Sequence, residues 1–145
     1  MKKLICMLMA LVLVLACTGM ALAEDDKITL TIAYNDSSDR GENDYRYNWV
    51  MDTWNAWDKK DQVEVKIQAE PVRDGDFFTK MQLQLGDPST APDIILYDTF
   101  QLQADVAAGY FMKLDDYVAK WDKWNDGTIY AATAAGVTAA DGSVY

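Results

Sequence analysis

Apolar and polar side chains alternate in two stretches of the chain, residues 28–34 and 63–67. Alternation with a period of two is typical of a β-strand with unlike faces. A third stretch, residues 93–97, is apolar after its first residue and rich in β-branched side chains. Such a run is typical of a strand buried on both faces. The pattern therefore predicts three strands, the third of them central and the most buried.

Helical spacing of apolar residues follows each predicted strand. Val50, Trp54 and Trp57 recur at i, i+4 and i+7, which predicts an amphipathic helix from Asn43 or Asp44, both suitable N-caps, to about residue 60. The second helix follows a turn at residues 73–76 and ends at a glycine, and the third also ends at a glycine. The apolar positions and closing glycines are Phe77, Met81, Leu85 and Gly86, then Leu102, Val106, Ala107 and Gly109.

The last part of the chain carries weaker signals. Residues 114–121 predict a short surface helix, and residues 131–140 are mostly alanine. Residues 141–145 predict a tight turn that enters another strand, because Asp-Gly is a hairpin signal. The order of strands and helices predicts an α/β fold with a mostly parallel sheet and helices on both faces.

An export signal precedes these elements. Lys2 and Lys3 lie before an apolar run at residues 4–15, and Ala-Leu-Ala at residues 21–23 precedes an acidic cluster. This is the pattern of a secretory signal peptide spanning residues 1–23. The apolar run is shorter than the roughly 20 residues of a membrane span. The exported domain is therefore expected to be residues 24–145.

A second processing route stays open. Val14, Leu15, Ala16 and Cys17 are similar to a bacterial lipobox, and cleavage before Cys17 would leave a lipid-anchored protein at the outer face of the membrane. Leu15 is unusual at its lipobox position, so the soluble product is the preferred expectation. Cys6 and Cys17 both lie in the leader. The exported domain would then lack thiol chemistry and disulfides.

Charge and composition exclude several function classes. The chain has 13 Lys and Arg residues against 23 Asp and Glu residues, and loss of Lys2 and Lys3 with the leader changes the net charge from −10 to −12. Such a surface disfavours nucleic acid and anionic membrane as partners. Histidine is absent, which removes the commonest general base and zinc ligand. A Ser-His-Asp or Cys-His site is therefore excluded within this segment.

The loop at residues 35–44 holds four carboxylates, which raises the question of calcium. An EF-hand requires glycine at its sixth position and glutamate at its twelfth. Counted from Asn35, these positions hold Arg40 and Arg46, so the pattern fails. A solvated loop and a ligand-facing loop remain the two main interpretations. No metal and no cofactor are predicted.

The stretch from Pro92 to Val118 resembles a known family. Pro-Asp-Ile-Ile at residues 92–95, the strand-end Tyr97, Ala-Ala-Gly-Tyr at 107–110 and Lys-Leu-Asp-Asp-Tyr-Val at 113–118 look like the extracellular solute-binding proteins of ABC importers. The sugar-binding, maltose-binding-protein-like branch is the best match. The resemblance extends over most of residues 28–145, and Pro-Asp-Ile-Ile and Ala-Gly-x-x-x-x-Leu-Asp-Asp are its sharpest parts.

The resemblance implies the first lobe of a two-lobed, periplasmic-binding-protein-like fold. It implies that the strand-end aromatic and the residues after it line a sugar cleft, together with the loop after the first strand. Ligands of open α/β sheets also bind at the carboxyl ends of parallel strands on general grounds. Trp49, near that loop, is a further candidate aromatic. The predicted ligand-binding residues are Tyr97, Asp98, Phe100, Gln101, Asn35 and Asp36.

The resemblance implies a protein that binds a solute without catalysing a reaction. An exported bacterial protein, a monomer when complete, would close two lobes around a sugar or oligosaccharide and deliver it to a membrane permease. The chain ends at Tyr145 within a predicted strand, so we expect an N-terminal fragment truncated before the second lobe. Two alternatives are a secreted carbohydrate-active enzyme, which needs two paired carboxylates, and a sensor ectodomain with the same fold.

Overall fold

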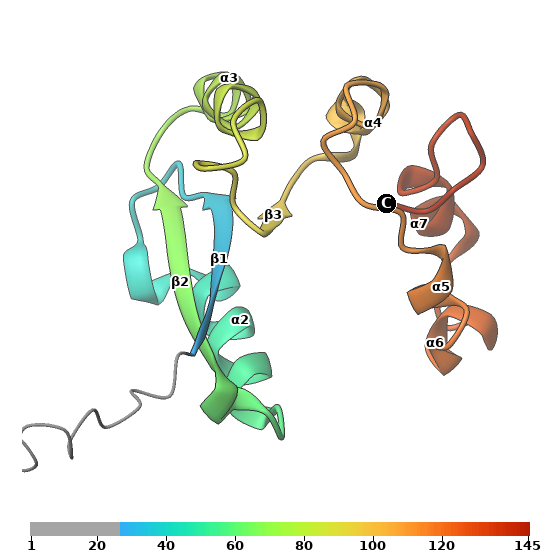
Figure 1. Ribbon diagram of the computed structural model, residues 1–145, viewed down its shortest axis with the longest axis horizontal. Coiled ribbons are helices and arrows are strands. Elements are labelled where there is room, and N and C mark those ends of the chain that lie inside the picture. Colours follow the sequence, from blue (N-terminus) through green and yellow to red (C-terminus); the bar gives the residue numbers. More distant parts are fainter. Residues whose placement is uncertain (1–26) are drawn as a thin grey trace, which may run out of the picture.

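The structure is a computed structural model that describes residues 27–145 (Figure 1). The predicted signal peptide and lipobox lie outside the described residues. The strands and α-helices, in chain order, are β1 (Ile28–Asn35), α2 (Tyr45–Ala56), β2 (Val63–Glu70), α3 (Asp74–Leu85), β3 (Ile94–Leu96), α4 (Leu102–Ala107), α5 (Asp115–Val118), α6 (Asp122–Asn125) and α7 (Ala131–Gly136). Short 3-10 turns lie at Gly41–Asn43, Lys60–Gln62 and Thr99–Gln101.

The three strands form one parallel sheet in the order β2-β1-β3. Ile28 pairs with Val63 at the start of β1, and Ile32 pairs with Ile94 further along it. The first strand of the chain is therefore the central strand, because each of its edges is paired with a later strand. The predicted α/β class with a parallel sheet is confirmed.

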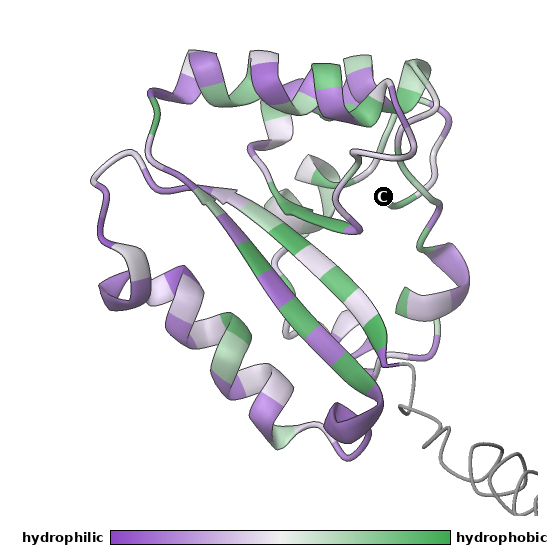
Figure 2. Cartoon of the chain, turned by 60° about the vertical axis from the view of Figure 1, so that its left-hand side comes forward, coloured by the Kyte–Doolittle hydropathy of each residue, from purple (hydrophilic) through white to green (hydrophobic). Residues whose placement is uncertain are grey.

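Helices cover the two faces of this sheet, as the alternation in β1 requires. Ala33 faces α3 and packs with the buried Phe77 and Met81. Ile32 points to the other face, where the buried Val50 of α2 lies. Figure 2 shows α2 and α3 on opposite sides of the strands, and the apolar positions of β1 and β2 alternate with polar ones. The prediction of helices on both faces is confirmed.

The position of β3 differs from the prediction. The apolar run at residues 93–97 was expected to form a central strand buried on both faces, yet β3 is three residues long and lies at the edge of the sheet. Ile94 is 43% exposed. The reason is that β3 pairs with β1 alone, and within residues 27–145 no strand pairs with its other edge.

The helix α2 is shorter than predicted. It begins after Asp44, as expected of this N-cap, but ends at Ala56 rather than near residue 60. Trp57 has extended backbone angles (φ −77°, ψ 133°) and therefore lies just outside the helix. Val50 is buried, whereas Trp57 is exposed. Trp57 nevertheless lines the same apolar hollow as Val50 and Trp54, so the three residues share one face as predicted.

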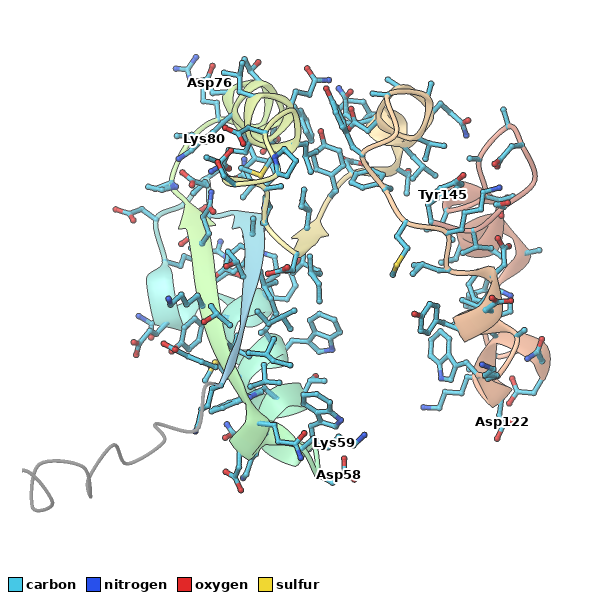
Figure 3. All side chains as sticks on the ribbon, viewed as in Figure 1. Asp58, Lys59, Asp76, Lys80, Asp122 and Tyr145 are labelled. Carbon is cyan, nitrogen blue, oxygen red and sulfur yellow. The ribbon has the colours of Figure 1, made fainter. Side chains whose placement is uncertain are left out.

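The segment after β3 lies to one side of the sheet, with Tyr145 near α7 and Asp122 in α6 (Figures 1 and 3). Two short helices, α5 and α6, replace the single surface helix that was predicted. The predicted turn at residues 141–145 is present, but the expected strand is a single antiparallel bridge between Thr138 and Val144. In the described part of the chain, no helix is long and apolar enough to cross a membrane.

Candidate functional site at the carboxyl ends of β1 and β3

A groove of about 430 Å³ opens where β1 and β3 end. The carboxyl ends of parallel strands meet at one edge of a sheet, and the N-termini of the adjoining helices face the same edge. The groove is accordingly lined from four elements. These are the end of β1 (Asn35), the start of α2 (Tyr45 and Arg46), the start of α3 (Asp74, Phe77 and Phe78) and the residues at and after the end of β3 (Leu96, Tyr97, Asp98 and Thr99).

The structure brings together some of the predicted binding residues and separates others. Asn35, Tyr97 and Asp98 line this one groove. Phe100 and Gln101 line a neighbouring groove of about 540 Å³, which Asp98 shares. The two grooves also share Asp74 and Phe78, so they adjoin each other along α3.

Asp36 lines neither groove. Its side chain is 1% exposed, and its Oδ2 accepts a hydrogen bond of 2.7 Å from the backbone N–H of Gly41. Its own backbone N–H donates to the carbonyl oxygen of Glu70 at 2.8 Å. These contacts close the loop that follows β1, and they place the carboxylate beneath the loop, apart from the residues that line the grooves.

Asn35 lies at the end of β1 with its side-chain amide held in place. Its Nδ2 donates to the carbonyl oxygen of Val72 at 3.2 Å, which fixes the orientation of the amide. Its Oδ1 is buried and has no hydrogen-bond partner among the described residues. A buried acceptor without a partner costs about 1–3 kcal/mol.

Tyr97 packs into an aromatic cluster and lines the groove at the same time. Its ring centroid lies 5.2 Å from that of Phe78, 6.2 Å from that of Phe77 and 6.1 Å from that of Phe111. Separations and tilts of this kind are favourable for aromatic pairs. The ring of Tyr97 is therefore held against the core while part of it stays accessible.

The hydroxyl of Tyr97, by contrast, is buried. Burial raises the pKa of this phenol well above its ordinary value, and the neighbouring carboxylate of Asp105 raises the pKa further. Asp105 is 1% exposed, and its Oδ1 accepts a long hydrogen bond of 3.5 Å from Nε2 of Gln82. A ligand in the groove can therefore contact the ring of Tyr97 but not its hydroxyl.

A charged and aromatic unit forms the start of α2. The carboxylate of Asp44 is fully buried and accepts three hydrogen bonds of 2.8 Å from the backbone N–H, Nε and Nη2 of Arg46. The guanidinium carbon of Arg46 lies 5.0 Å from the ring centroid of Tyr34 and 5.2 Å from that of Tyr45. A guanidinium at this distance attracts both rings by a cation–π interaction. Arg46 therefore connects the helix cap to the rim of the groove.

The pair of Asp44 and Arg46 predicts a loss of stability in acid. The hydrogen bonds from Arg46 lower the pKa of Asp44 from 3.8 to about 2. A carboxylate whose pKa is lowered by folding stabilises the fold above its unfolded pKa, and this contribution disappears as the pH falls through the folded pKa. We expect the advantage of the native protein over Asp44→Asn to shrink between about pH 4 and pH 2. Urea unfolding of both proteins at pH 5, 4, 3 and 2 measures it; a constant difference would contradict the expectation.

Two other hollows have mainly apolar linings. One of about 210 Å³ lies between α2 and the sheet, and its lining is apolar apart from Thr53. Trp49, the additional aromatic candidate, lines this hollow and not the groove. The other, of about 680 Å³, lies between β3 and the C-terminal segment, and Tyr97 and Asp98 line it as well as the groove, among mainly apolar side chains. Within residues 27–145, no group of three or more Cys, Asp or Glu side chains is placed to hold a metal ion.

The sequence analysis missed Tyr45, Arg46 and Asp74 as residues of the groove. All three lie in the first turn of a helix that follows a strand of the parallel sheet. Helix N-termini face the carboxyl edge of such a sheet. The predicted helix starts at residues 43–44 and 73–76 were therefore the signal that should have added them.

The α/β fold, with three parallel strands and helices on both faces, matches part of a solved solute-binding protein. This structure is an ABC transporter solute-binding protein from Thermotoga lettingae TMO, crystallised with alpha-D-tagatose, and it matches with a TM-score of 0.58 and 19% identity. The match covers 82% of this chain and only 28% of that one. No protein-family model matches the sequence, and no curated protein matches it. At this identity the likeness shows the fold alone.

Proposed function

We propose that this chain is the solute-capturing first lobe of an exported binding protein that serves an ABC importer. The observation that carries the proposal is the groove in which Asn35, Tyr97 and Asp98 converge from β1 and β3. The likeness in fold to a solute-binding protein with a bound sugar supports the same class of function. In this proposal the second lobe lies beyond the present chain, and closure of the two lobes retains the solute.

The chemistry of the groove suits a carbohydrate. A sugar ring has apolar C–H faces and a rim of hydroxyl groups, so it matches an aromatic ring beside polar acceptors. The groove supplies the ring of Tyr97, the side chain of Asn35 and the exposed carboxylate of Asp98. Phe100 and Gln101 extend the same surface along α3, and we propose them as contacts for a longer ligand.

Localisation is part of the proposal. We propose that the leader is cleaved after Ala23, which yields an exported protein in the periplasm or at the outer face of the membrane. A lipid-modified Cys17 is the competing outcome. The intact mass of the protein isolated from its native host separates them, because the lipid-modified form starts at Cys17 and carries added acyl mass.

Solute binding is expected to be weak but localised. One lobe supplies about half of the contacts of a two-lobed cleft, so we expect millimolar rather than micromolar affinity for D-tagatose, D-glucose or maltose. Nuclear magnetic resonance titration of ¹⁵N-labelled residues 24–145 detects such binding. Shifts confined to Asn35, Tyr97, Asp98 and their neighbours are expected.

Two outcomes would count against this function. The absence of any shift in the groove with all three sugars would contradict a carbohydrate-binding lobe. Hydrolysis of maltose by the same protein would instead favour the enzyme alternative, in which Asp74 and Asp98 of the groove would supply the two carboxylates that glycoside cleavage needs.

A further inference from the structure

Tyr45, the first residue of α2, places an aromatic side chain beside the groove. Tyr45 is 69% exposed, yet its ring also lines the groove. An exposed tyrosine normally samples several rotamers, whereas here the guanidinium of Arg46 lies 5.2 Å from its ring centroid. The ring is therefore accessible to a ligand and restrained at the same time.

The restraint on Tyr45 rests on buried groups. Arg46 is fixed by a two-point ion pair with Asp44, whose side chain is 0% exposed. Its guanidinium also lies over the fully buried ring of Tyr34. A bidentate guanidinium–carboxylate pair holds one geometry more firmly than a single charged contact does. Arg46 therefore adopts a defined position before any solute arrives.

The charge balance of the groove indicates which class of solute would contact the ring of Tyr45. The charge of Arg46 is compensated by Asp44, whereas neither Asp74 nor Asp98 has an ion-pair partner among residues 27–145. Both of these carboxylates line the groove. Two uncompensated carboxylates therefore face the groove, and their charge repels anions and permits neutral polyhydroxylated rings.

We propose that Tyr45 is a solute-contacting residue, an outer aromatic wall of the groove that Arg46 and Asp44 hold in place for a neutral sugar ring. The inference rests on the proposed function, because it names a contact residue and a positioning residue of the same site. Tyr45 supplies the stacking surface. Arg46 acts through Tyr45 as a positioning residue.

The test compares variants at Tyr45 in the ¹⁵N titrations with D-tagatose, D-glucose and maltose. Tyr45→Ala is expected to raise the Kd by about three- to tenfold, the loss of one aromatic stacking contact. Tyr45→Phe keeps the ring and should bind as the native protein does. Tyr130→Ala is the matched control, because Tyr130 is 81% exposed and lies outside the groove; its Kd should not change.

The positioning role of Arg46 needs a double-mutant cycle. Arg46→Lys keeps the charge and loses the bidentate geometry, so it should weaken binding in the native background. In the Tyr45→Ala background it should have no further effect, because its role passes through that ring. An undiminished effect there would overturn the positioning role and make Arg46 a direct contact.

The failures of the two proposals are distinguishable. Suppose the sugars shift the resonances of Asn35 and Tyr97 but Tyr45→Ala binds as tightly as the native protein. The assignment of Tyr45 as a solute contact is then wrong, and the proposed function stands. If no sugar shifts any residue of the groove in the native protein, both are wrong. Equal binding of D-glucuronate and D-glucose would refute the selection for neutral rings.

Discussion

Replacement of Phe77 by alanine is expected to lower the free energy of unfolding by about 3–5 kcal/mol. The ring is 1% exposed and packs with Ala33 and Met81 beneath the sheet. Removing it opens a cavity in the middle of the core, where β1 and α3 meet. Domains of this size are stable by about 5–15 kcal/mol, so the variant should lose a large share of its stability. Urea unfolding monitored by circular dichroism measures the change.

Leu83→Ala is the matched control on the same helix. Leu83 belongs to α3 but is 75% exposed, and surface substitutions usually change stability by less than about 0.5 kcal/mol. A similar loss for both variants would show that helix propensity, rather than burial against β1, determines the effect. A loss below about 1 kcal/mol for Phe77→Ala would place the core elsewhere.

Replacement of Tyr97 by alanine should affect stability and binding together. The ring is half-buried against Phe77, Phe78 and Phe111, so we expect a loss of about 2–3 kcal/mol, below the range for a fully buried aromatic. The same ring lines the groove, and we expect solute affinity to fall by roughly tenfold. Thermal unfolding and ¹⁵N titration of the same samples measure both quantities.

Tyr97→Phe separates the ring from the hydroxyl. The hydroxyl is buried near Asp105 and is inaccessible from the groove. The variant should therefore keep the solute affinity of the native protein, and its stability should change by about 1 kcal/mol or less. Ile95→Ala, which removes a half-buried side chain packed on the core, serves as the control that loses stability with little direct effect on affinity. A tenfold weaker affinity for Tyr97→Phe would show that the hydroxyl contacts the solute.

Local pattern identified the three strands and the helices that follow each of them, but not the short C-terminal helices or the position of every strand. The alternation at residues 28–34 and the run at 93–97 each mark a strand, because side-chain periodicity is a local property. Whether a strand is central or at an edge depends on its partners. The run around Ile94 is apolar enough for a central strand, yet β1 takes the central place in the described part of the chain.

The residues of the candidate site were likewise predictable only in part. Asn35, Tyr97 and Asp98 follow strand ends directly, so the edge of the sheet brings them together. Asp36 is one residue further on, and its carboxylate turns inward to the amide of Gly41. An acidic loop sequence does not reveal which carboxylates face solvent, because that depends on the backbone N–H groups that the loop itself leaves unpaired.

The central place of the first strand has a consequence for biosynthesis. Ile28 pairs with Val63 and Ile32 pairs with Ile94, so the backbone groups of β1 cannot be paired until these later residues have been synthesised. At synthesis rates of about 5–20 residues per second, this delay is on the order of seconds. During that time the unpaired backbone edge of β1 and its apolar side chains are open to a chaperone. Pairing with β2 can begin once residues 63–70 have emerged, but the second edge of β1 stays unpaired until residues past Leu96 have emerged.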